Sequence, residues 1–247
     1  MADESQKSSK QPFALDFVGI CKSFGSHLVL NDINISLEAG QSLCVYGPNA
    51  VGKTTLLQIA AGLVRANAGK VTISGLDLHE QPQKASTLIG YISHKPMVYP
   101  QLTVLENLRF FADLYGVAEA QQRIEQLMIQ SGLDGYRYDR ASVLSRGMLQ
   151  RLAIARAMVH QPSVLLADEP FTGLDADASR YLIGVFNDFT DRGRSILMTT
   201  HNVGLSLQCC RSVAVLEAGS FIFNSETSQV DTAAFTTDYL AFARSAN

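Results

Sequence analysis

Short, nearly uniform apolar runs recur along this chain, with segments of mixed character between them. A run of four or five mostly apolar residues is typical of a strand buried on both faces, as the strands of a parallel sheet are. We expect such strands at residues 43–46, 88–92, 164–167 and 195–199. The remaining patterns predict an antiparallel pair near the N-terminus, joined by a turn at residues 22–25, and a hairpin near the C-terminus; the strands are residues 13–20, 28–37, 213–216 and 221–223.

The segment between the second and third apolar runs has helical periodicity instead. Thr103 is followed three residues later by Glu106, a capping-box pattern that marks the start of a helix. A second helix is expected over residues 118–131, and Ser145 is a good N-cap for a third. Because no strand alternates with these helices, the pattern predicts a helical lobe, about residues 96–160, inserted into an α/β body.

The first apolar run leads directly into Gly47-Pro48-Asn49-Ala50-Val51-Gly52-Lys53-Thr54-Thr55, and a helix-like run follows. This stretch fits the P-loop pattern G-x-x-x-x-G-K-[ST] in the strand–loop–helix context that the pattern requires. The two glycines let successive N–H groups point at one centre, and the helix N-terminus adds its positive end. Lys53 can add a point charge for the β- and γ-phosphates, and the Thr54 hydroxyl suits Mg²⁺. The stretch therefore predicts a nucleoside triphosphate site.

Polar residues follow two of the other buried runs. Ligands of open α/β sheets bind outside the carboxyl ends of the strands, so these residues are candidates for the same site. Asp168 could orient Mg²⁺, Glu169 could accept a proton from an attacking water, and His201 could donate to the γ-phosphate or to that water. The plainer alternatives are that residues 168–170 only form a strand exit and that His201 is an ordinary hydrogen-bonded polar group.

Leu144-Ser145-Arg146-Gly147-Met148 stands at the start of the third expected helix and offers a hydroxyl and a glycine. It is a second possible anion site, because a helix N-terminus carries N–H groups without partners in the helix. One chain has one P-loop, so a second phosphate site suggests the nucleotide of a partner chain. A capped helix with no further role is the alternative.

Composition and charge narrow the class of protein. The 247 residues are 47% hydrophobic and 17% charged, which describes a globular chain that can bury a core. The net charge of −3 provides no general attraction to nucleic acid or anionic lipid, and no apolar run reaches the ~18 residues of a membrane span. Residues 1–11 are polar, lack the apolar region of a secretory signal and are expected to form a disordered tail.

The four cysteines are expected to be buried, reduced thiols. No pair of them has C-x-x-C spacing, so neither a zinc site nor a thioredoxin-type motif fits. A redox pair formed by the adjacent Cys209 and Cys210 is the alternative.

Five motifs in their order and spacing resemble an ABC-transporter ATPase subunit, over residues 13–224. The motifs are residues 47–55, 144–148, 164–169, 173–175 and His201. The resemblance implies an α/β fold: a P-loop NTPase core with a RecA-like parallel sheet, an N-terminal antiparallel β subdomain and an inserted α-helical subdomain. It also implies that residues 12–247 form a single ABC ATPase domain.

ATP and Mg²⁺ are the cofactors that the resemblance implies. Phe24 would stack on adenine, residues 47–55 would hold the phosphates, and Thr54 and Asp168 would hold Mg²⁺. The ATPase would lie peripherally on the cytoplasmic face of the inner membrane, bound to integral membrane transporter subunits without inserting into the bilayer itself. Nucleic acid would not be a partner.

The same resemblance implies a working homodimer. Glu169 would be the catalytic base, and His201 would be the switch histidine. Ser145 and Gly147 would close on the γ-phosphate of ATP bound by the opposite subunit. Asp175 would signal across that interface.

Three positions depart from the family pattern. Arg146 and Met148 replace a glycine and the glutamine of the usual LSGGQ signature, and His94 stands in a loop that usually offers glutamine. We expect His94 to substitute for that glutamine beside the nucleotide; a haem ligand is the alternative.

Residues 90–96 and 102–110 narrow the resemblance to the CcmA family of cytochrome c maturation ATPases, or haem exporters, which implies haem handling. Other exporters of the ABC-2 type and soluble ABC ATPases of the iron–sulfur assembly type are the alternatives.

Overall fold

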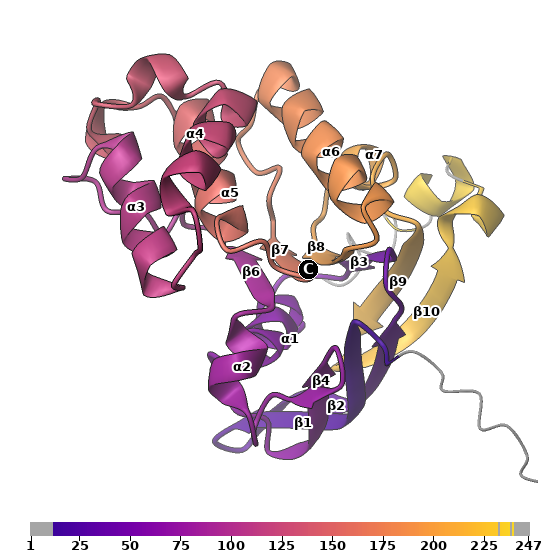
Figure 1. The fold of residues 1–247 in the computed structure, drawn as a ribbon. Coiled ribbons are helices and arrows are strands. Elements are labelled where there is room, and N and C mark those ends of the chain that lie inside the picture. Colours follow the sequence, from indigo (N-terminus) through magenta and orange to yellow (C-terminus); the bar gives the residue numbers. More distant parts are fainter. Residues whose placement is uncertain (1–11, 232, 238, 240–247) are drawn as a thin grey trace, which may run out of the picture.

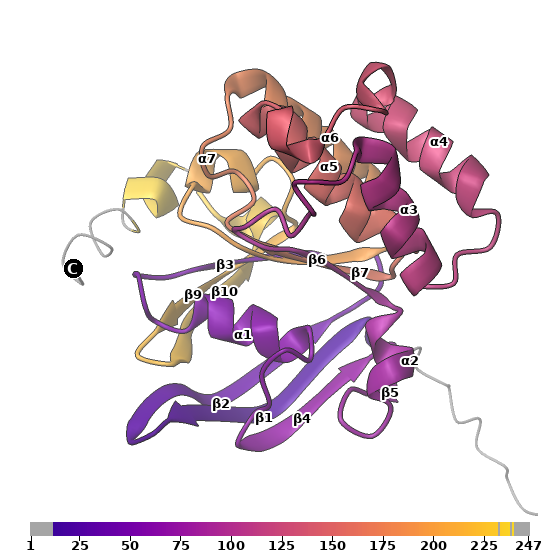
Figure 2. The same ribbon diagram turned by 90° about the vertical axis from the view of Figure 1, so that its left-hand side faces the viewer.

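The computed structural model describes residues 12–231, 233–237 and 239 of the chain. Its strands form two sheets, with the orders β2-β1-β4-β5 and β10-β9-β3-β8-β7-β6 (Figures 1 and 2). One helix lies between the sheets, and the other long helices lie beyond the larger sheet (Figure 2). The tail predicted at residues 1–11 lies outside the described residues.

The smaller sheet is antiparallel and confirms the predicted N-terminal β subdomain. Its strands are β1 (Leu15–Phe24), β2 (His27–Leu37), β4 (Ala68–Ile73) and β5 (Leu76–Asp77). One boundary prediction was wrong, because residues 22–24 continue β1 and the turn lies at Gly25 and Ser26. Phe24 pairs with His27, and Gly25 has a φ of 59°, a left-handed conformation that glycine adopts easily. Two residues are therefore enough to reverse the chain.

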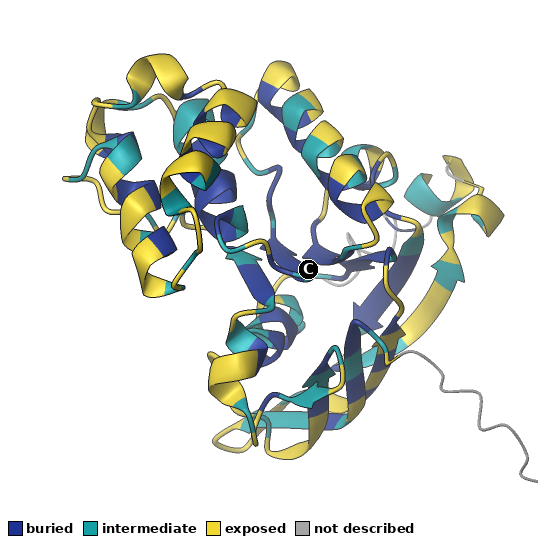
Figure 3. Ribbon diagram, viewed as in Figure 1, coloured by how far each residue is buried: buried dark blue, intermediate teal, exposed yellow. Residues whose placement is uncertain are grey.

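The larger sheet contains the four buried runs as parallel strands, as predicted. They are β3 (Ser42–Tyr46), β6 (Ile89–Ile92), β7 (Val164–Asp168) and β8 (Ser195–Thr199). The predicted hairpin extends this sheet: β9 (Ser212–Glu217) runs parallel to β3, and β10 (Ser220–Glu226) returns antiparallel. Every residue of β3, β7 and β8 is buried, which explains why these runs do not alternate (Figure 3).

Two cores hold the larger sheet in place. On one face, α1 (Lys53–Ala60) lies between the two sheets, and its buried Leu56 and Leu57 join the apolar residues of both (Figure 2). On the other face, α6 (Ala176–Asp191) and α7 (Val203–Ser206) pack on the sheet. Because the sheet is covered on both faces, its open positions are the strand ends, and the carboxyl ends of β3, β7 and β8 meet at one edge.

A third core belongs to the inserted helices and confirms the α-helical subdomain (Figure 1). Thr103 begins the first helix as predicted: its hydroxyl accepts from the Glu106 N–H at 3.1 Å, and the Glu106 carboxylate accepts from the Thr103 N–H at 2.8 Å. The helices are α3 (Val104–Leu114), α4 (Ala120–Ser131), the 3-10 helices η1 (Asp134–Tyr136) and η2 (Ala141–Val143), and α5 (Arg146–Met158).

The remaining helices are short. They are α2 (Pro82–Ser86) and the 3-10 helix η3 (Thr227–Gln229). Within the described ranges, no helix has the length and apolar character needed to cross a membrane. Three of the four cysteines are buried, as expected, whereas Cys21 on the smaller sheet is only partly buried.

Candidate nucleotide site

The P-loop connects the end of β3 to the start of α1, and close contacts require both of its glycines. A Cβ atom at Gly47 would lie 2.5 Å from the carbonyl oxygen of Leu216, and one at Gly52 would lie 2.9 Å from the side chain of Leu30. Gly52 has a φ of 111° and is the N-cap of α1, where it supplies no side-chain cap. The first N–H groups of α1 are therefore left for another acceptor, such as an anion.

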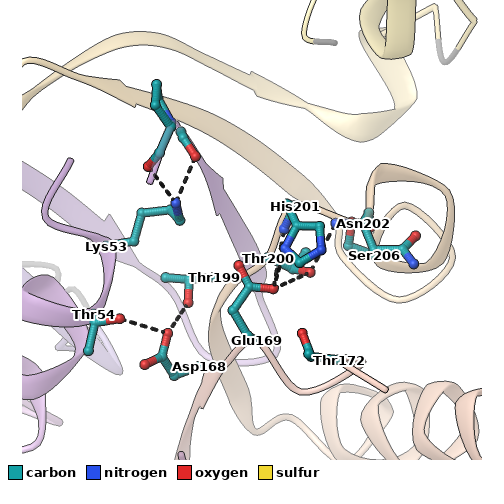
Figure 4. Close-up of polar contacts among 12 residues, drawn as sticks. Lys53, Thr54, Asp168, Glu169, Thr172, Thr199, Thr200, His201, Asn202 and Ser206 are labelled. Carbon is teal, nitrogen blue, oxygen red and sulfur yellow. Dashed lines mark hydrogen bonds and ion pairs between the residues drawn. The ribbon is translucent and has the colours of Figure 1, made fainter. Parts of the chain in front are cut away.

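Lys53 folds back toward this loop. Its Nζ donates to the carbonyl oxygens of Gly47 at 2.7 Å and Pro48 at 2.8 Å (Figure 4). Burial lowers the pKa of Lys53, and the carboxylates of Glu169 and Asp168 oppose that shift. An ammonium group that has lost part of its hydration and lies at a helix N-terminus is well placed to bind phosphate.

Asp168 ends β7 and is almost fully buried. One of its carboxylate oxygens, Oδ1, accepts from Thr54 Oγ1 at 3.2 Å and from Thr199 Oγ1 at 2.7 Å (Figure 4). Carboxylate and hydroxyl oxygens are the ligands that Mg²⁺ prefers, and it usually keeps several waters as well. The described residues contain no cluster of three or more histidine, cysteine or acidic side chains that could hold a metal. The donor set of Thr54 and Asp168 thus fits an ion that is bound largely through phosphates and water.

Glu169 follows Asp168 and is held by residues that follow β8. Its Oε2 accepts from His201 Nδ1 at 2.9 Å, from Thr200 Oγ1 at 3.1 Å and from the His201 N–H at 3.4 Å (Figure 4). Glu169 has a φ of 50°, a left-handed conformation that is uncommon for a residue with a side chain. Backbone strain of this kind concentrates at functional sites. The structure therefore brings Lys53, Asp168, Glu169 and His201 to one edge of the sheet, where an anion could be bound and a water positioned.

A model of the ABC transporter family matches residues 30–172. The chain belongs to the ABC transporter family. It is 33% identical over 218 residues to a Nod factor export ATP-binding protein of Rhizobium johnstonii, a match that covers 87% of this chain and 70% of that protein. The wider family prediction is confirmed, and the chain is an ATP-binding ATPase of this family.

Solved structures agree with the fold. An ATP-binding subunit of an ABC transporter superposes with a TM-score of 0.84 at 25% identity, covering 94% of this chain and 99% of that one. A dimeric ATP-binding cassette in a post-hydrolysis state with ADP and Pi superposes with a TM-score of 0.78 at 23% identity, covering 86% of this chain and 98% of that one. The predicted α/β architecture is therefore confirmed.

The signature segment of this ABC protein lies apart from its P-loop. Ser145 is the N-cap of α5, where its hydroxyl accepts from the Met148 N–H at 3.3 Å, and it is exposed to solvent. Gly147 is partly exposed, and a Cβ there would lie 3.8 Å from the side chain of Ala178. No hydrogen bond or ion pair among the described residues joins Ser145 or Gly147 to residues 47–55. Within one chain, the second predicted phosphate site is thus not brought to the first.

Two other residues that were predicted to contact the nucleotide are exposed to solvent. Phe24, at the end of β1, is 52% exposed, and the Nζ of Lys22 lies 4.7 Å from its ring centroid. His94 follows β6 and is exposed, with no hydrogen bond or ion pair among the described residues. Both side chains are accessible to a ligand, but neither is held toward the P-loop by a contact of its own.

Several residues that have contacts in this site were not predicted from the sequence. Thr199 and Thr200 bind the two carboxylates, and the sequence signal was two hydroxyl residues directly before His201. The hydroxyl of Tyr239 donates to the carbonyl oxygen of Gly47 at 3.3 Å. No local pattern could have indicated that contact, because 192 positions separate the two residues.

Proposed function

We propose that this chain is the ATP-hydrolysing subunit of an ABC exporter, and that two copies close on ATP to drive an integral membrane partner. One observation supports the proposal: no hydrogen bond or ion pair among the described residues joins the exposed start of α5 to the P-loop. Lys53, Asp168 and Glu169 gather at one edge of the sheet, whereas Ser145 caps a helix whose start is open to solvent. A second copy could present its Ser145 and Gly147 to the nucleotide of the first.

The residues of the P-loop half would act mainly through charge and position. Lys53 and the N–H groups at the start of α1 would bind the β- and γ-phosphates, as phosphoryl transfer requires. Thr54 and Asp168 would hold Mg²⁺, which neutralises phosphate charge when it is bound. Glu169 would position the attacking water and accept its proton. For that, Glu169 must exchange part of its hydrogen bonding with His201 for the water.

An exposed aromatic surface after β6 fits the membrane partner. Met97, Tyr99 and Phe110 are 48%, 46% and 41% exposed, respectively. The Tyr99 ring packs edge-on against Phe110 with a centroid distance of 5.0 Å, and the guanidinium of Arg156 lies 5.4 Å from the centroid of the neighbouring Phe111 ring. Exposed apolar patches of this kind mark interaction sites. We infer that the membrane subunit docks here, which would place the ATPase peripherally on the cytoplasmic face of the inner membrane.

The cargo of the membrane partner is a separate part of the proposal. The name of the Nod factor export relative supports export as the direction of transport. Haem handling in cytochrome c maturation remains a narrower hypothesis, which depends on residues 90–96 and 102–110 alone. It predicts that the membrane proteins purified with this chain are cytochrome c maturation subunits. A soluble ATPase of the iron–sulfur assembly type would instead be purified without any integral membrane protein.

A Glu169→Gln variant tests the two-copy site. The substitution keeps the size of the side chain but removes the base, so ATP should remain bound and the dimer should accumulate. Size-exclusion chromatography with ATP and Mg²⁺ should show a dimer, and the same variant with ADP or without nucleotide should elute as a monomer. A variant that binds ATP by calorimetry and still elutes as a monomer would contradict the proposal.

A further inference from the structure

Thr199, the last residue of β8, and Thr200, which follows it, lie beside Asp168, the last residue of β7, and Glu169, which follows that strand. The strands run parallel, and their register places Thr199 directly opposite Asp168. Thr199 and Thr200 are 0% and 1% exposed. Two buried hydroxyl groups therefore adjoin the two acidic groups on which the proposed hydrolysis depends.

Thr199 holds Asp168 by one oxygen. Its Oγ1 donates to Oδ1 at 2.7 Å, the shortest hydrogen bond to either carboxylate in the described part of the chain. Thr54, the candidate Mg²⁺ ligand, donates to the same oxygen at 3.2 Å. Across the described ranges, no hydrogen bond reaches the other oxygen, Oδ2, which is left for an ion or its waters. Because Thr199 belongs to the sheet and not to the P-loop, it can hold the carboxylate whether or not nucleotide is present.

Thr200 holds Glu169 in a corresponding way. Its Oγ1 accepts from the Asn202 N–H at 3.1 Å and donates to Glu169 Oε2, also at 3.1 Å. The bond from Asn202 orients the hydroxyl, so its own proton is directed at the carboxylate. His201 also binds Oε2, but its side chain is 68% exposed and is free to turn toward a ligand. Thr200 is buried and can keep Glu169 in place when the imidazole leaves.

We propose that Thr199 and Thr200 are positioning residues with separate tasks: Thr199 orients Asp168 for Mg²⁺, and Thr200 orients Glu169 for the attacking water. The inference rests on the proposed ATP hydrolysis at this site. Each threonine acts through one carboxylate and has no contact with the P-loop residues 47–55 among the hydrogen bonds of the described chain (Figure 4). The last residue of β8 and the residue after it thus divide metal binding from water activation.

The test compares Thr199→Val with Thr200→Val in the full chain. ATP hydrolysis is measured at saturating ATP over a range of Mg²⁺ concentrations. Binding of Mn²⁺ in the presence of a non-hydrolysable ATP analogue is measured by electron paramagnetic resonance, and it should weaken in Thr199→Val and stay unchanged in Thr200→Val. Thr199→Val should raise the Mg²⁺ concentration for half-maximal rate by about ten-fold, as expected when a charged group loses one hydrogen bond, and excess Mg²⁺ should restore the rate. Thr200→Val should lower kcat by about ten-fold at every Mg²⁺ concentration and leave the half-maximal concentration unchanged. Thr199→Ser and Thr200→Ser keep the hydroxyl and should restore wild-type behaviour.

Each variant is the control for the other, and Thr190→Val controls for the loss of a buried hydroxyl elsewhere. Thr190 is buried, and its hydroxyl donates to carbonyl oxygens within α6. If both valine variants change Mg²⁺ dependence and kcat alike, or if the serine variants fail to restore them, the division of tasks is wrong. Unchanged kinetics in both valine variants would also overturn it. Failure of the two-copy site would show separately, as an absence of ATP-dependent dimer in Glu169→Gln.

Discussion

The P-loop half of the site and the α5 half differ in how far a single chain completes them. Around the P-loop, Lys53, Asp168 and Glu169 all have hydrogen-bond partners that hold them at the sheet edge. At α5, Ser145 caps its own helix and Gly147 touches little else. The contacts within the chain therefore organise the P-loop half, whereas no such contact ties the start of α5 to it, as the proposed two-copy site requires.

The N-termini of the long helices also differ in whether acidic residues lie beside them. Helices of globular proteins are stabilised by acidic residues near their N-termini. Here α3 and α6 have an acidic residue in the first turn, and α4 has Glu119 at its N-cap. By contrast, α1 and α5 have neither, since Gly52 and Ser145 are their N-caps. The two helices proposed to face phosphate are thus the long helices of the described chain whose positive ends are not neutralised.

The largest effect is expected from removing the charge of the P-loop half. Lys53→Ala should weaken ATP binding by about 100-fold, because two hydrogen bonds between charged groups contribute roughly 3 kcal/mol together. Isothermal titration calorimetry measures this loss. Lys70→Ala is the matched control, because Lys70 is exposed and pairs with Asp77 at 3.1 Å on the smaller sheet. Equal ATP affinities of the Lys53→Ala variant and the wild type would exclude the P-loop from the nucleotide site.

Local sequence signals predicted the strand, loop and helix of the P-loop, because that order depends on adjacent residues. The stretch at residues 47–55 is only nine residues long and gave the order strand, loop and helix, although the close contacts at its two glycines come from Leu216 and Leu30 elsewhere in the chain. The carboxylate partners Thr199 and Thr200 could not be assigned in this way, since their contacts depend on how β7 and β8 align in the sheet. The turn after β1 was misplaced because Lys22 and Ser23 are polar, although both pair with β2. Polarity there reflects a partly exposed strand end and not a reversal of the chain.

A charge introduced at the start of α5 should weaken the ATP-dependent dimer and leave ATP binding to the monomer unchanged. Ser145→Asp keeps an N-cap residue but puts a carboxylate where the partner's γ-phosphate is proposed to arrive. Repulsion between like charges should weaken the ATP-dependent dimer of Glu169→Gln by at least about ten-fold, whereas ATP binding to the monomer should not change. Analytical ultracentrifugation over a range of protein concentrations measures the dimer constant.

Ser145→Asn is the control for this substitution, since asparagine caps a helix equally well without a charge. It should dimerise far better than Ser145→Asp. Equal dimer constants for the two variants would mean that no phosphate approaches Ser145, and the α5 half would then be an ordinary capped helix.

His160 lies where the helical subdomain meets the larger sheet, and its protonation should destabilise the packing between them. Its Nε2 donates to the carbonyl oxygen of Ile89 at 2.9 Å, and its ring stacks on Tyr115 with centroids 3.8 Å apart. Its buried Nδ1 has no hydrogen-bond partner among the described residues. Burial is the main reason that the pKa of His160 is lowered to about 4; the charges of Arg156 and Arg123 act in the same direction, and the hydrogen bond to Ile89 opposes them. Protonation would therefore create a buried charge with an unpaired donor.

The sign of the pH effect follows from this pKa. The unfolded chain binds the proton below about pH 6.5, whereas the folded chain does so only near pH 4, so stability is complete above pH 6.5 and is lost as the pH falls toward 4. Between about pH 7 and pH 5, the free energy of unfolding should fall by about 1–2 kcal/mol. Urea unfolding at both pH values measures it. His160→Gln should remove most of this dependence, and the exposed His27→Gln should keep it; an equal dependence in both variants would contradict the assignment.

The smallest expected effect concerns Phe24, the exposed residue that is predicted to stack on adenine. Phe24→Ala should weaken ATP binding by about five-fold, because stacking on a base contributes roughly 1 kcal/mol. The same variant should bind inorganic tripolyphosphate as tightly as the wild type does, since the phosphate contacts are unchanged. Phe24→Trp keeps an aromatic face and should retain ATP affinity in competition calorimetry. An equal loss of affinity for tripolyphosphate and for ATP would show that Phe24 supports the P-loop and does not stack on the base. The predicted contact between Phe24 and adenine would then be wrong, whereas the predicted phosphate site would be unaffected.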